Sequence, residues 1–167
     1  ITFFLNGGWE QLLSRFSSPL SPPTYFWKFM IKRSEGDKWF SKCVRMRARW
    51  KCEVCDSQYD ESSTGLHCSH HFGRRHKATR TEPLNCIAAC YACHRKLEED
   101  PLFHVEFFKK HIGEDVYEIL AEKHRVILPK REYDERMISK HFREQFRQQQ
   151  KKEAEGVQGR LDFIGYI

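Results

Sequence analysis

Residues 85–94 read NCIAACYACH, an apolar run that ends in a C-x-x-C pair, Cys90 and Cys93, followed directly by a histidine. A second pair with the same spacing, Cys52 and Cys55, lies earlier in the chain, with 34 residues between Cys55 and Cys90. Four thiolates in two such pairs are the ligand set of a closed, tetrahedral structural zinc site. The spacing therefore predicts one zinc site that joins two distant stretches of the chain, with a folded segment between them.

Two other chemistries compete for these cysteines. A redox C-x-x-C would need only one pair and a thioredoxin-like β-α-β context, which the flanking sequence lacks. The string CYACH at residues 90–94 matches c-type haem attachment, but haem attachment needs export and leaves the first pair unexplained. Zinc is therefore favoured, and the remaining Cys43, Cys68 and Cys86 are interpreted as small buried apolar residues.

The segment between the pairs has the composition of two strands and a helix. The stretches GLHCSHHF (65–72) and LNCIAAC (84–90) are strand-like in length and composition, and the basic loop GRRHKATRTEP (73–83) separates them. The stretch HRKLEED (94–100) begins a helix. This order predicts a ββα unit that is too small to be stable without metal, which contributes of order 10 kcal/mol in isolated zinc peptides.

The flanks are predicted to be mainly helical. Asp37 is the expected N-cap of a short amphipathic helix with one apolar and one basic face. Two helices broken at Gly113 should follow Pro101, and a last helix should cover about residues 133–153 with a polar end that protrudes into solvent. Their expected core residues are Phe107, Phe108, Val116, Ile119, Leu120, Ile138, Phe142 and Phe146.

The overall prediction is an α+β, mainly helical fold with one modest core. Residues 1–36, which include SSPLSPP, favour an irregular arm, and because the first methionine is Met30 we expect a natural start near MIKRSEGDKWF. Lys and Arg outnumber Asp and Glu by 29 to 23, and a pI near 9.0 favours a polyanionic partner. No apolar run approaches a membrane span, and no secretion signal is recognisable, so we expect a cytoplasmic location and no membrane partner.

The order C-x-x-C, His-His, Pro-x-Asn, C-x-x-C-His resembles the HNH, or ββα-metal, endonucleases. The zinc-clamped version with a helical tail resembles phage recombination nucleases of the NinG and endonuclease VII type. The resemblance covers about residues 37–128, which it implies are a nuclease domain, with residues 129–167 forming a C-terminal helix and tail. It further implies hydrolysis of DNA phosphodiesters to a 5′-phosphate and a 3′-hydroxyl, in a bacterial host cell if the protein is phage-encoded.

The resemblance implies a role for each motif residue. His71 matches the general base, and Asn85 matches the residue that orients that base. His70 and His94 match ligands of one catalytic ion, and Glu98 lies one helical turn after His94, where some relatives have a further ligand. Imidazole ligands favour Zn²⁺, Ni²⁺ or Mn²⁺ over Mg²⁺, so the ion stays open among these four.

The assignment of His70 and His71 to one site requires that the strand end or bulge between them. Adjacent strand residues point to opposite faces, so His70 and His71 can address one site only if the strand ends or bulges there. Gly73, two residues later, favours such an ending. His67 matches no motif position and is interpreted as structural.

The basic loop is the expected DNA contact, through Arg74, Arg75, Lys77 and Arg80. The alternative function is a zinc-containing DNA-binding module without catalysis, because the four cysteines and this loop would suffice for it. The long polar last helix also leaves a homodimer open.

Overall fold

The computed structural model describes residues 32–129 and 133–166, and from Lys32 onward the chain forms one compact unit. Most of the arm expected over residues 1–36 lies outside the described residues. The fold is α+β and mostly helical, as predicted. No helix in the described part of the chain is long and apolar enough to cross a membrane. The elements are α1 (Glu35–Arg47), β1 (Leu66–His70), α2 (Lys77–Arg80), the 3-10 turn η3 (Pro83–Asn85), β2 (Cys86–Cys90), α3 (Tyr91–Glu99), α4 (Pro101–Ile112), α5 (Glu114–Arg125) and α6 (Glu135–Ala154).

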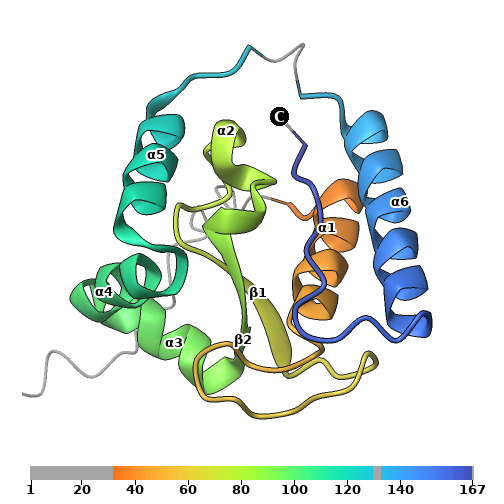
Figure 1. The fold of residues 1–167 in the computed structure, drawn as a ribbon. Helices are drawn as coiled ribbons and strands as arrows, with labels where there is room; N and C mark the ends of the chain where they lie inside the picture. The colour runs from red at the N-terminus through yellow and green to blue at the C-terminus, as the bar shows by residue number, and fades with distance from the viewer. Residues whose placement is uncertain (1–31, 130–132, 167) are drawn as a thin grey trace, which may run out of the picture. The chain divides into compact units, whose positions relative to one another are not determined.

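A two-stranded antiparallel hairpin lies at the centre, between α1 and α6 on one side and α4 and α5 on the other (Figure 1). Leu66 of β1 pairs with Cys90 of β2, and His70 pairs with Cys86. The helix α3 begins directly after β2, so two strands and a helix follow one another in the predicted order. The segment expected as a basic loop contains the short α2 and η3 instead of irregular chain alone.

The helix α1 begins one turn earlier than predicted. Ser34 is its N-cap, and Asp37 is the third helical residue rather than the cap. The two form a capping box, because the Asp37 amide donates to Ser34 Oγ and the Ser34 amide donates to Asp37 Oδ2. The sequence S-x-x-D at residues 34–37 carries this motif, with Ser34 rather than Asp37 at the cap.

The largest apolar cluster joins α1 to α6, which lie side by side in Figure 1. Phe40 meets Phe142 edge to face with ring centroids 5.0 Å apart, and Ile138 and Phe146 are buried beside them as predicted. Residues 150–154 at the end of α6 are exposed, as predicted, but Gln149 just before them is buried, and its amide donates to the carbonyls of Cys43 and Leu161. A buried glutamine is stable here because its donor group meets backbone acceptors.

The C-terminal tail packs back on the same unit. Leu161 is buried, and its amide donates to the Arg47 carbonyl at the end of α1. The Phe163 ring lies 5.8 Å from that of Phe40, and the Tyr166 carbonyl accepts from Thr81 Oγ1. The last helix and tail therefore complete the core around α1.

The helices α4 and α5 are separated at Gly113, as predicted, where φ is 90° and favours glycine. Phe108 and Leu120 are buried, and Phe107 and Val116 are half-buried. The prediction of a core position for Ile119 is wrong, because its side chain is 67% exposed. The buried stripe of α5 runs through Leu120 and the half-buried Tyr117 instead.

Candidate metal centre and histidine groove

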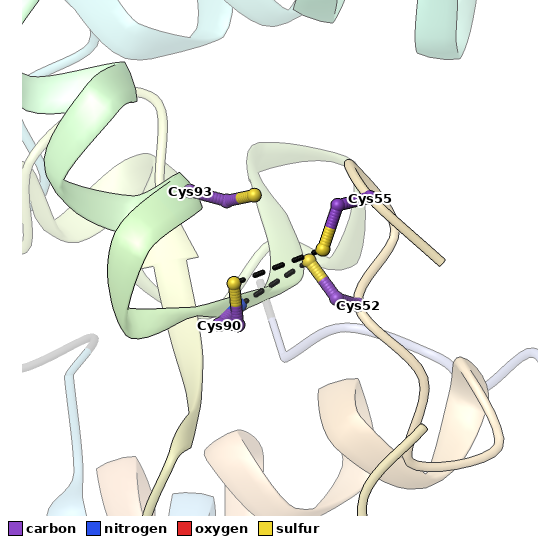
Figure 2. Close-up of side chains that lie close together, drawn as sticks. All are labelled: Cys52, Cys55, Cys90 and Cys93. Atoms are coloured by element: carbon purple, nitrogen blue, oxygen red, sulfur yellow. Dashed lines mark hydrogen bonds between the residues drawn. The ribbon is translucent and has the colours of Figure 1, made fainter. Parts of the chain in front are cut away.

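The four cysteines of the two C-x-x-C pairs come together at one point. Cys52 and Cys55 lie in the segment after α1, while Cys90 ends β2 and Cys93 lies in the first turn of α3 (Figure 2). All four sulfur atoms lie within 4.8 Å of one another. The predicted set can therefore hold a metal ion, and four thiolates at this spacing are the ligands that zinc prefers.

Backbone hydrogen bonds shape the first pair into a knuckle. The Asp56 amide donates to the Cys52 carbonyl, and Asp56 takes a left-handed φ of 62°. The Glu53 amide donates to the Ala88 carbonyl of β2, and the Cys90 amide donates to Cys52 Sγ at 3.3 Å. These bonds hold the segment after α1 against the hairpin, so the ligands are positioned by the fold around them.

The most exposed of the four cysteines is already suited to binding a cation. Hydrogen bonds from Ser57 lower the pKa of Cys55 to about 6, so its thiolate is favoured at neutral pH. Only the thiolate form of cysteine is a metal ligand. The exposed Cys55 therefore offers an entry point for the ion.

A groove of about 690 Å³ lies on the α1 side of β1 and reaches α3. Three histidines from two elements line it, so we call it the histidine groove. Its lining residues are Arg33, Asp37, Ser41, Arg45, Glu61, Ser62, Ser63, Thr64, Leu66, His67, Cys68, His70, Gly73, Arg74, His94 and Glu98.

His70 lines this groove with one nitrogen fixed as a donor. Its Nε2 lies 3.1 Å from the Arg80 carbonyl oxygen, which can only accept, so Nε2 carries the proton and Nδ1 the lone pair. Burial lowers the pKa of His70 to about 4, which keeps the ring neutral at pH 7. The ring also packs 5.9 Å from Phe40. His70 is thus held in one tautomer with a lone pair available.

Two further imidazoles and a carboxylate lie at the α3 end of the groove. His94 Nε2 is 3.8 Å from Glu98 Oε1, one turn along α3. The His67 ring lies 5.5 Å from that of His94, and His67 Nε2 lies 3.1 Å from the Thr64 carbonyl oxygen. His67 is predicted to be structural, and nothing in the sequence marks its place in the groove, because strand alternation groups it with His71, which faces the other side.

The structure does not bring His71 into the groove. The β1–β2 pairing continues past the end of β1, because the His71 amide donates to the Asn85 carbonyl, so no bulge turns the residue round. The His71 ring lies 4.6 Å from both Phe108 and His104 of α4, and its Nε2 hydrogen bonds to the Tyr117 hydroxyl at 2.9 Å. His70 and His71 therefore face opposite sides, as strand alternation requires.

Asn85 also has a different contact from the expected one. Its side chain accepts from the Phe72 amide and donates to the carbonyls of Phe72 and Thr79. The residue is fully buried, and no hydrogen bond joins its side chain to the His71 ring among the described residues. The Asn85 side chain therefore holds the turn that follows β1. Through its hydrogen bond to the Thr79 carbonyl it also positions the segment whose Arg80 carbonyl accepts from His70.

The four basic residues predicted to contact DNA lie in different surroundings. Arg74 lines the histidine groove, and Arg75 is exposed. Lys77 lies 5.6 Å from the Tyr133 ring. Arg80 is only 8% exposed, and its guanidinium makes two hydrogen bonds with the Asp37 carboxylate. A direct phosphate contact through Arg80 is therefore not supported, because the side chain is buried and paired.

The groove contains two arginines that the sequence did not single out. Arg33 precedes α1, and Arg45 lies on the basic face predicted for that helix. Two of the groove's acidic residues are already engaged: Asp37 binds Arg80, and Glu61 lies 3.2 Å from Lys42 Nζ. Arginines of α1 and the segment after β1 therefore border one groove, which suits an anionic ligand.

The burial of His71 predicts a pH dependence of stability. Burial, with smaller contributions from His104 and His124, lowers the pKa of His71 to about 4 from an unfolded value near 6.5. The unfolded chain therefore binds about one more proton in this interval, so the stability from neutral His71 is complete above pH 6.5 and declines as the pH falls towards 4.

We expect His71→Gln to flatten this decline. Urea unfolding of wild type and variant at pH 7.5 and 5.0, with equal zinc present, measures it. The wild-type midpoint should fall further between the two pH values than that of the variant. Equal falls in the two proteins would show that His71 is not held neutral by the fold.

Comparison of the chain with protein-family models, curated proteins and solved structures found no match.

Proposed function

We propose that the protein is a metal-dependent endonuclease that hydrolyses phosphodiester bonds of DNA in the histidine groove. The observation that carries the proposal is the meeting of His70, His94 and Glu98 with Arg33, Arg45 and Arg74 along one groove. Phosphodiester hydrolysis needs a base, a divalent ion and positive charge around the phosphate. The groove offers a residue for each requirement, next to the four-cysteine centre that we propose binds structural zinc.

In this proposal His70, rather than His71, is the general base. His70 lines the groove, and the Arg80 carbonyl keeps the proton on Nε2, so that Nδ1 carries the lone pair. A base must reach the proton that it removes, and His71 is packed against α4 and α5 instead. Burial lowers the pKa of His70 to about 4, which leaves the ring unprotonated at neutral pH and able to accept a proton.

His94 and Glu98 are the proposed ligands of the catalytic ion. They offer one nitrogen and one oxygen from the same face of α3, and burial lowers the pKa of His94 so that its ring is neutral. Two protein ligands leave positions for water and for a phosphate oxygen, as Mg²⁺ and Mn²⁺ sites in nucleic-acid enzymes commonly do. When bound, the ion supplies Lewis acidity to the phosphate and lowers the pKa of its water.

The arginines would bind the phosphates beside the scissile bond. Arg74 lies in the segment after β1, and Arg45 donates to the Ser41 carbonyl in its own helix, with its guanidinium 5.2 Å from the Trp50 ring. Arginine donates two parallel hydrogen bonds to a phosphate, which fixes its orientation as well as its place. Contacts of this kind carry no base information, so we propose cleavage with little sequence preference.

The test is nicking of supercoiled plasmid by the purified full chain. We expect relaxed plasmid to form in Mg²⁺, Mn²⁺ or Ni²⁺, with at least one ion effective, and none to form in EDTA. The expected products carry a 5′-phosphate, read by ligation of the nick. Binding to the plasmid without nicking in any of these ions would overturn the proposal and favour a zinc-containing DNA-binding module.

A further inference from the structure

A second group of metal-ligating side chains lies on the α1-facing side of the hairpin. Cys68 and His70 are alternate residues of β1, and Cys86 pairs with His70 across the hairpin. One ligand atom from each of the three lies within 4.8 Å of the others. This set is separate from the four-cysteine centre and shares no residue with it.

We propose that Cys68, His70 and Cys86 form a second metal site, for a soft ion such as Zn²⁺, and that filling it inhibits the nuclease. Two thiolates and one imidazole bind zinc with a fourth position left open, a ligand number found in open zinc sites. Thiolate ligands also select zinc over Mg²⁺ and Mn²⁺. The site therefore differs in ion preference from the His94–Glu98 pair.

The contacts of the three residues leave their ligand atoms available. Nε2 of His70 is used by the Arg80 carbonyl, so Nδ1 is the nitrogen left to bind an ion. The nearby Cys43 is already engaged, because its thiol donates to the Phe142 carbonyl at 3.3 Å, and it is not part of the group. Cys86 is buried, whereas Cys68 and His70 border the histidine groove, so an ion can enter from the groove.

The occupied site would carry no net charge of its own. Two thiolates and one Zn²⁺ sum to zero charge, so the occupied site is neutral where burial disfavours net charge. Binding would displace the thiol protons, as metal binding to cysteine requires.

Inhibition follows from the lone pair that the ion occupies. A ring whose Nδ1 binds zinc and whose Nε2 donates to Arg80 has no nitrogen left to accept a proton. Binding of the ion does not depend on the proposed nuclease function, whereas the inhibition rests on it.

The first measurement is the zinc content of the full chain after dialysis against zinc. We expect about two equivalents per chain for wild type and about one for Cys68→Ala, while Cys43→Ala, a neighbouring cysteine outside the group, keeps about two. Substitution with Co²⁺ gives a second readout, since thiolate-to-cobalt absorbance should fall in Cys68→Ala. One equivalent in wild type, or two in Cys68→Ala, would overturn the site.

The second measurement is plasmid nicking in Mn²⁺ with and without added zinc, each protein compared with its own zinc-free rate. Wild type should lose most of its activity as the second equivalent binds, and Cys68→Ala should keep most of its own. Full wild-type activity with two equivalents bound would overturn the inhibition. If wild type nicks nothing in any ion, the proposed function fails, and the zinc contents alone decide whether the second site exists.

Discussion

Cys52→Ser should unfold the hairpin and α3 at 25 °C. Cys52 contributes one of the four clustered sulfurs and also accepts the Cys90 amide, so its loss weakens the metal centre and a backbone contact together. Zinc binding contributes of order 10 kcal/mol to folding in small zinc domains, which is comparable to the whole net stability of a typical domain. We expect near-ultraviolet circular dichroism to show the loss of fixed tertiary structure, and zinc content to fall by about one equivalent.

Cys43→Ser is the matched control for this change. Cys43 is also fully buried, but it lies outside both cysteine groups, and a serine hydroxyl can replace its donation to the Phe142 carbonyl. This variant should keep its zinc and a cooperative thermal transition. If Cys52→Ser melts cooperatively at nearly the wild-type temperature, the centre does not hold the fold together.

Arg47→Met should produce the second large loss of stability, about 3–5 kcal/mol. The Arg47 side chain is 1% exposed, and it donates to the carbonyls of Pro83 and Cys86 and to Glu53 Oε2. Removing it leaves the Pro83 and Cys86 carbonyls without this donor and takes away one of the cations that face the buried Glu53 carboxylate. Urea unfolding at pH 7 measures the loss.

Glu53 explains why the loss of Arg47 should cost more stability than the loss of an ordinary surface ion pair. Its carboxylate accepts from the Ala88 amide and lies 3.1 Å from Arg160 and 3.5 Å from His111, so it links the first cysteine pair to β2, α4 and the tail. Arg95→Met is the control, because Arg95 pairs with Glu99 on the exposed face of α3 and its loss should barely change the urea midpoint. Equal losses in the two variants would contradict the structural role of Arg47.

The sequence was sufficient for the features that depend on spacing. Two C-x-x-C pairs predict one shared metal site, because together they supply the four thiolates of a tetrahedral zinc site. The four sulfur atoms do lie together in the structure. The periodicity of Ile138, Phe142 and Phe146 predicted their burial because one face of a helix must meet the core. The glycine between α4 and α5 marked the break for a local reason, its positive φ.

Features that depend on tertiary contacts were missed or placed differently. Spacing could not decide whether β1 bulges after His70, because that depends on the pairing of His71 with Asn85 across the hairpin. The burial of Arg80 depends on Asp37, 43 residues away, and that of Gln149 depends on the Cys43 carbonyl. Polar residues whose partners are distant in sequence look exposed when read alone.

The proposal that the histidine groove is the catalytic site is tested most directly by the same substitution at two adjacent histidines. The measurement is the rate of plasmid nicking for His70→Gln and His71→Gln, at pH 7.5 with the most effective ion. Glutamine keeps an amide donor but cannot accept the proton of water in the way that imidazole does. His70→Gln should lose about 10²-fold or more, and His71→Gln should stay near the wild-type rate. A large loss in His71→Gln with His70→Gln still active would contradict the assignment and return the base to His71.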